Sequence, residues 1–317
     1  MSRSLLHSDY VSGSNYGMKN RIINGGMDIW QRGTSFSSGI NAVTYTADRW
    51  IAYAGGGALT IFRSGGDGDF PYCMAAAGAA GNTSLTFSQR IESVNTYSAV
   101  GKSFTIKARI YSSTGISGSY LIVTAPNTAD TWSAGVTVIV ASPSVTLAAG
   151  VWTDISFTFT TTTATQRGME IILNWGNAVL SGNTVAMTGV QLEVGAIATP
   201  FEHRPYGTEL ALCQRYFEVL LSLSVNRYVT AGNIFSATRT ICRVPYVVEK
   251  RAVPTVTNNS ISMTINYSGV AQVSTTISNL YPFPTSCGFD FLTTGLTPGT
   301  CCHLDVNSGS ISVSAEL

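Results

Sequence analysis

The sequence has few charged side chains. Asp, Glu, Lys and Arg make up 11% of its 317 residues, against about 25% in an ordinary soluble protein. A protein with so little charge covers its surface with Ser, Thr, Asn and Gly, or buries part of that surface in an oligomer. The 18 basic and 17 acidic residues leave a net charge of +1. Because no run of Lys or Arg occurs, the sequence gives no sign of a surface for nucleic acid or an anionic membrane.

Long apolar runs are also missing. No stretch of about 18 apolar residues occurs, which excludes an ordinary transmembrane helix. The first ten residues contain one Arg but no apolar core, so we expect no secretory signal and synthesis in a reducing cytoplasm. Hydrophobic residues still amount to 44%, which is enough for sizeable cores. At roughly 150 residues per domain, the length predicts two domains.

Short motifs typical of enzymes are absent. The chain has no Gly-x-Ser-x-Gly, no His-Glu-x-x-His, no Ser-x-x-Lys and no complete Walker pattern. Its three histidines, His7, His203 and His303, lie in the N-terminal tail, in a Pro-flanked turn and beside two cysteines. We therefore expect a protein without enzymatic activity and without a cofactor. A polysaccharide depolymerase with its active site between subunits is the least favoured alternative.

The six cysteines are scattered, with no Cys-x-x-Cys pair and no zinc-finger spacing. Buried free thiols are the interpretation that we favour. Two alternatives stay open: a metal site formed by Cys287 with Cys301, Cys302 and His303, and a disulfide formed after release into oxidising surroundings. Adjacent cysteines are poorly placed to chelate one ion, which weighs against the metal site.

Short alternating segments separated by Gly, Ser, Asn and Pro predict an all-β chain. Residues 103–111 and 153–160 alternate apolar and polar side chains, as strands with one buried face do. Residues 120–124, 135–140 and 168–174 are rich in β-branched side chains. Many short strands with turns about every ten residues predict a sandwich, a jelly roll or a barrel.

One segment breaks this pattern. Residues 207–221 are mostly helix formers and begin near Thr208, a suitable N-cap. We therefore divide the chain into a docking tail (1–19), a β domain (20–206), a linker helix (207–221) and a C-terminal β domain (222–317). The helix either packs on its own domain or also meets its copies at a three-fold axis.

Four aromatic side chains in predicted loops are candidate glycan contacts: Trp132, Trp175, Tyr281 and Phe283. The C–H faces of sugar rings stack on aromatic rings, and neighbouring polar groups bind the hydroxyls. For Trp132 and Trp175, packing in the core or at a subunit interface is the favoured interpretation, and a glycan contact is the alternative.

Asp67 and Asp69 flank a glycine and could supply oxygen ligands to a calcium ion. A plain turn is the favoured interpretation of this segment, so we predict no metal site and keep these two residues as weak candidates.

Several stretches resemble one family, the tail-fibre and virion-appendage proteins of bacteriophages. The opening of a jelly-roll module of that family is similar to 21–33 and 46–50, and its closing strand is similar to 190–195 and 198–205. The helix at 209–217 follows directly, as it does in that family. The last domain, with 248–256 and the terminal 315–317, is similar to the C-terminal domain of the same proteins.

The resemblance implies a jelly roll like that of carbohydrate-binding modules at 20–206, followed by a small β-sandwich domain. It also implies a homotrimer on the outside of a virion, assembled in the host cytoplasm and bound to other virion or tail proteins through residues 1–19. The ligand would be a host cell-surface glycan, although the resemblance transfers no ligand-binding residue. The alternative is a purely structural decoration or connector protein whose aromatic side chains are buried between subunits.

Overall fold

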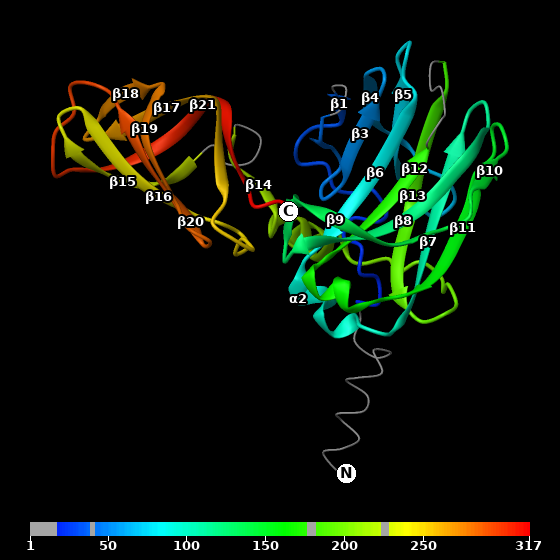
Figure 1. Ribbon diagram of the computed structural model, residues 1–317. Coiled ribbons are helices and arrows are strands. Elements are labelled where there is room, and N and C mark those ends of the chain that lie inside the picture. The colour runs from blue at the N-terminus through cyan, green and yellow to red at the C-terminus, as the bar shows by residue number, and fades with distance from the viewer. Residues whose placement is uncertain (1–17, 39–41, 176–181, 223–227) are drawn as a thin grey trace, which may run out of the picture. The chain divides into compact units, whose positions relative to one another are not determined.

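A computed structural model shows that the chain is built almost wholly from β-sheet (Figure 1). The structure describes residues 18–38, 42–175, 182–222 and 228–317. It divides into two compact units, Met1–Glu209 together with Leu317, and Leu210–Glu316. The predicted fold class is confirmed: a jelly-roll β-sandwich, one short helix and a small C-terminal β domain. Residues 1–17 lie outside the described residues, so the docking tail stays a prediction.

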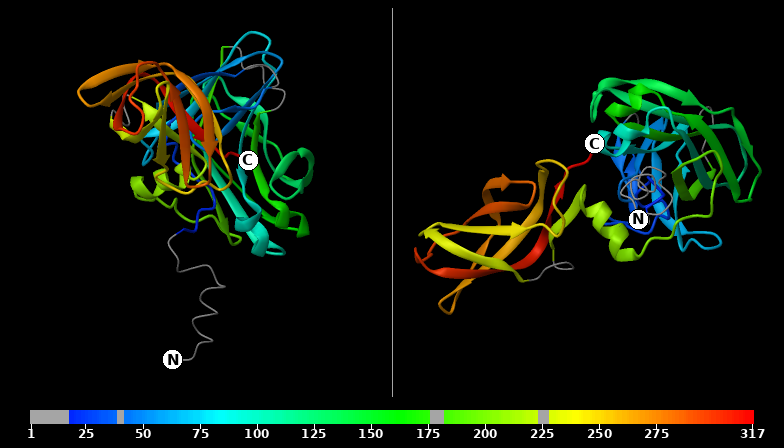
Figure 2. Two further views of the ribbon diagram at one scale, coloured as in Figure 1. Left: turned by 90° about the vertical axis from the view of Figure 1, so that its left-hand side faces the viewer. Right: turned by 90° about the horizontal axis from the view of Figure 1, so that it is seen from below.

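The first unit is a sandwich of two antiparallel sheets, visible as layers in Figure 2. One sheet has the order β1 (Ser35–Ser38), β4 (Leu59–Gly65), β5 (Tyr72–Gly78), β13 (Thr184–Val194), β7 (Ser103–Ser112), β11 (Thr153–Thr160). The facing sheet has the order β10 (Val145–Leu147), β8 (Ile116–Thr128), β12 (Met169–Trp175), β6 (Ser84–Ile91), β3 (Ile51–Gly55), β2 (Thr44–Tyr45), with β9 (Thr131–Ala141) beside β8. Short helical turns are α2 (Ser93–Thr96), η1 (Tyr97–Ala99) and η2 (Thr163–Arg167).

The predicted alternation explains the core between the sheets. Phe104, Ile106, Ala108 and Ile110 of β7 all point inward and are buried. Their neighbours in sequence point outward, so Lys107 and Arg109 lie on the outer face of the six-stranded sheet. Period-two patterning therefore fixes which side chains are free to form a site.

A β-bulge in β13 also shapes that outer face. The pairing of β13 with β7 shifts register between Thr188 and Gln191, and Gly189 within the bulge has a φ of +59°. A Cβ atom at Gly189 would lie 2.6 Å from Cζ of Phe70. The missing side chain thus lets the Phe70 ring lie directly against the strand.

The predicted linker helix is shorter than expected. α3 spans Tyr206–Gln214 and β14 spans Phe217–Ser222, so the helix prediction over 207–221 is wrong at its C-terminal end. Strand β14 pairs with the last strand of the chain and shifts register between Val219 and Leu221. This irregularity buries both Leu220 and Leu221. No helix within the described ranges is long and apolar enough to cross a membrane.

The second unit is one antiparallel sheet folded over a single core. Its order is β18 (Val270–Ser274), β17 (Thr255–Tyr267), β21 (Cys301–Ser314), β15 (Tyr228–Ser236), β16 (Arg239–Pro245), β20 (Ser286–Leu292), β19 (Thr276–Pro282), with β14 also paired to β21. Met263 of β17 and Phe289 of β20 belong to the same core although their strands are not neighbours, which makes the unit a small sandwich. The last strand is central to it, since β21 pairs with β14, β15 and β17.

Candidate functional site

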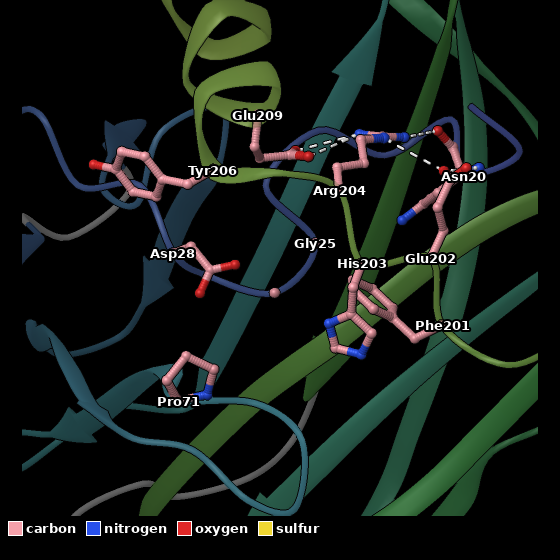
Figure 3. A pocket seen from close by; sticks show the side chains of 11 residues that line it. Asn20, Gly25, Asp28, Pro71, Phe201, Glu202, His203, Arg204, Tyr206 and Glu209 are labelled. Atoms are coloured by element: carbon pink, nitrogen blue, oxygen red, sulfur yellow. Dashed lines mark hydrogen bonds and ion pairs between the residues drawn. The ribbon is translucent and has the colours of Figure 1, made fainter. Parts of the chain in front are cut away.

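Two adjoining cavities lie in the first unit. We call the first the Asp28 pocket: it has a volume of about 280 Å³ and is lined by Asn20, Gly25, Gly26, Asp28, Pro71, Phe201, Glu202, His203, Arg204, Tyr206 and Glu209 (Figure 3). We call the second the Arg109 groove: it has a volume of about 510 Å³ and is lined by Asp69, Phe70, Lys107, Arg109, Asp154, Gly189, Ala198, Thr199, Pro200, Phe201 and His203. Phe201 and His203 border both cavities, so the two cavities adjoin.

Three aromatic rings form one wall of the groove, and two of them, Phe201 and His203, also border the pocket. Phe201 meets Phe70 edge-on, with 4.9 Å between the ring centroids and an interplanar angle of 80°. The His203 ring lies 4.9 Å from that of Phe201 and 5.6 Å from that of Phe70. The two phenylalanine side chains are half-buried, whereas His203 is exposed. The packed rings therefore present a fixed apolar surface to the solvent.

Charged side chains border the groove. Asp154 of β11 lies opposite Arg109 in the strand register, and its carboxylate is 3.6 Å from the Arg109 guanidinium and 3.5 Å from the Lys107 ammonium. A second carboxylate, that of Asp67, lies 3.1 Å from Arg109. Exposed ion pairs of this kind add little stability. They do hold donors and acceptors in place where sugar hydroxyls could bind them.

A buried ionic network supports the pocket from behind. The Glu202 carboxylate accepts the backbone N–H groups of Lys19 and Asn20, both at 3.0 Å. Arg204 lies 3.3 Å from Glu202 and 3.1 Å from Glu209. Glu209 also accepts the backbone N–H of Asn24. Sequence reasoning missed this network, although it joins stretches that carry the family resemblance: 21–33 and 198–205.

Asp28 differs from the other acidic groups of the pocket. Its carboxyl group is half-buried and has no hydrogen bond or salt bridge to the part of the chain that the structure describes. Figure 3 shows it directed into the space bordered by Tyr206, Pro71 and His203. Burial, and secondly the Glu209 carboxylate, raise the pKa of Asp28 above its ordinary value, while His203 acts in the opposite direction. A positive or hydrogen-bond-donating ligand would supply the missing partner.

The two tryptophans that were candidate glycan contacts are both buried. Trp175 ends strand β12 and is 1% exposed, with its ring edge-on to Phe87 at 5.4 Å. Trp132 lies in strand β9 and is 8% exposed, with the Arg90 guanidinium 5.1 Å from its ring. Polar neighbours gave both positions the appearance of loops, but in a strand such neighbours belong to the opposite face. Neither ring has a face open to a sugar.

Tyr281 lies near the end of β19 in the second unit and Phe283 directly follows that strand; they are 46% and 49% exposed. The Tyr281 hydroxyl donates to Asp290 at 3.3 Å, and the Arg243 guanidinium lies 5.2 Å from the Phe283 ring. Both side chains are accessible, so their role as glycan contacts stays a prediction.

The weak metal candidates are engaged otherwise. Asp67 pairs with Arg109, and Asp69 lines the groove. Among the described residues, no three His, Cys, Asp or Glu side chains lie close enough together to hold a metal ion. Adjacent Cys301 and Cys302 lie on opposite faces of β21, the first exposed and the second buried with Cys287. They therefore do not converge on one ion.

Comparison with known proteins gives distant structural similarity alone. No protein-family model matches the chain, and no characterised protein matches its sequence. A structure described as "CBM4 structure and function" is 18% identical, covers 54% of this chain and 98% of its own, and has a TM-score of 0.35. A putative sugar-binding protein from Bacteroides thetaiotaomicron is 12% identical, over 56% of this chain and 100% of its own, with a TM-score of 0.39. The enzymatically active domain of bacteriophage CBA120 tailspike protein 4 is 13% identical, over 57% of this chain and 22% of its own, with a TM-score of 0.34.

Proposed function

We propose that this chain is a phage tail-fibre or virion-appendage protein that binds a host-surface glycan in the Arg109 groove. One observation carries the glycan part: an aromatic wall of Phe70, Phe201 and His203 adjoins the fixed charges of Arg109 and Asp154. A sugar ring stacks its C–H face on such a wall, and its hydroxyls bind the neighbouring charged groups. Neither feature depends on the tryptophans that the sequence suggested.

The virion part of the proposal is supported by different features. The charge content of 11% and the all-β construction suit a subunit that buries surface in an assembly. Two stretches that resemble the phage family, 21–33 and 198–205, are joined by the Arg204 network. We propose a homotrimer assembled in the host cytoplasm, attached to other virion proteins through residues 1–19, that binds without catalysis.

The experiment is binding of the purified chain to a glycan array and to host cells, before and after Phe201→Ala. We expect the variant to bind about tenfold more weakly, a difference of ~1.4 kcal/mol, because it loses the central ring of the wall. Tyr97→Ala is the matched control, since Tyr97 is 65% exposed and borders neither cavity. Thermal unfolding of both variants separates lost binding from lost folding.

The outcomes separate the candidate functions. Wild-type protein that binds neither glycans nor cells would favour the structural decoration or connector protein. Release of reducing ends from a host polysaccharide would instead revive the depolymerase alternative. Equal loss of binding in both variants, without unfolding, would remove the groove as the glycan site.

A further inference from the structure

We propose that the Asp28 pocket is a subsite for a protonated amino group, so that the glycan recognised by this chain carries an unacetylated amino sugar. This inference rests on the proposed function and deepens it. The groove would hold a sugar ring against Phe201 and His203, and the pocket would take the ammonium substituent of that ring or of its neighbour.

Two of the three carboxylates that line the pocket already have partners in the protein, which leaves one for a ligand. Glu209 is bound by Arg204 and by the backbone N–H of Asn24. Glu202 is bound by Arg204 and by two backbone N–H groups. Asp28 alone among these three has no such partner within the described ranges, and its carboxyl group faces the cavity (Figure 3).

The electrostatics favour a cation over other ligands. A half-buried carboxylate without a counter-charge is poorly solvated, and an ammonium group that donates to it removes that penalty. The neighbouring Glu209 carboxylate adds negative potential at Asp28, which disfavours uronic acids and other anionic sugars. A neutral hydroxyl can donate to Asp28 too, but a charge-assisted hydrogen bond is roughly twice as strong.

The shape of the site also suits a substituent on a sugar. The pocket has a volume of about 280 Å³. It lies beside the aromatic wall of the groove, since Phe201 and His203 line both cavities. Tyr206, which is 64% exposed, borders the other side. Aromatic rings next to a carboxylate attract ammonium groups through cation–π contacts. A bare metal ion is a poorer fit, since the described residues offer no set of three ligands there.

Space for Asp28 depends on a neighbouring glycine. A Cβ atom at Gly26 would lie 2.9 Å from Oδ2 of Asp28. The absence of a side chain at Gly26 therefore leaves the Asp28 carboxyl group room to face the cavity.

The test compares two oligosaccharides of equal length, one of glucosamine and one of N-acetylglucosamine, by calorimetry at a pH at which the amines are protonated. Wild-type protein is expected to bind the glucosamine oligomer about tenfold more tightly, as expected for one added charge-assisted hydrogen bond. Asp28→Asn should remove this preference while leaving binding of the acetylated oligomer unchanged. Glu249→Gln is the matched control, since Glu249 is exposed and borders neither cavity, and it should keep the preference.

Each result bears on the inference. Equal binding of the two oligomers, no binding of the glucosamine oligomer, or a preference that survives in Asp28→Asn would overturn it. Such a result would not by itself contradict the proposed function, because the groove could still bind a glycan without an amino group. The glycan array and the Phe201→Ala variant test that function separately. Thermal unfolding of Asp28→Asn confirms that any lost preference comes from a folded protein.

Discussion

Asp28 is half-buried and has no partner among the described residues, which is an unfavourable position for a charged carboxylate. The pH dependence of the free energy of unfolding follows from this position. The pKa of Asp28 is raised in the folded protein, first by burial and then by Glu209, and returns to the ordinary carboxyl value on unfolding. Between these two values the folded state binds more protons than the unfolded state. The free energy of unfolding therefore falls as the pH rises through that window.

Asp28→Asn should accordingly stabilise the protein at pH 7 by up to about 1 kcal/mol, because it removes an unpaired, partly buried charge. The gain should vanish below the ordinary carboxyl pKa, where Asp28 is protonated in both states. Urea unfolding of the wild type and the variant at a series of pH values measures this difference. Asp69→Asn, at an exposed position, should show almost none; a variant less stable than wild type at pH 7 would contradict the expectation.

At the scale of single elements, the bulge of β13 positions the aromatic wall. Gly189 adopts a left-handed conformation and lies against the Phe70 ring, which in turn contacts Phe201 and His203. The three rings come from two separate loops, one before β5 and one after β13. Their convergence depends on the bulge, which no local sequence pattern predicts.

Gly189→Ala should therefore both destabilise the first unit and weaken glycan binding. The new Cβ atom would displace Phe70, and the positive φ is strained for alanine; together we expect a loss of about 2 kcal/mol in stability. Gly150→Ala is the matched control, because Gly150 also has a positive φ, +71°, but has nothing within 4 Å of the added atom. Equal effects of the two substitutions on binding would exclude the displacement of Phe70 as the cause.

The same scale explains which elements could be predicted. The alternation of apolar and polar residues in 103–111 and 153–160 predicted strands β7 and β11 and the side chains that point inward from them. The helix-forming residues of 207–221 predicted a helix, yet Phe217–Ser222 pairs with β21 as a strand with a register shift. Local propensity did not decide this segment, because the partner strand lies about 90 residues further along the chain.

For the whole molecule, low charge and exposed apolar side chains lead to a prediction of assembly. Ile197, Phe235 and Val247 are each more than 60% exposed, and the chain as a whole has few charges to keep a free subunit soluble. We expect light scattering to give a solution mass of about three times 33.6 kDa. A stable monomer would contradict the trimer and favour a free-standing sugar-binding module.

The sequence by itself determined the all-β class, the inward faces of its alternating strands and the low surface charge, because these follow from composition and from a period of two residues. The tertiary structure alone decided the site. Trp132 and Trp175, which the sequence offered as glycan contacts, are buried. Asp28, Phe70, Phe201 and Arg109 instead line two adjoining cavities. These four residues are far apart in sequence, and their proximity arises from sheet pairing and the β13 bulge, which are long-range interactions that a local pattern does not encode.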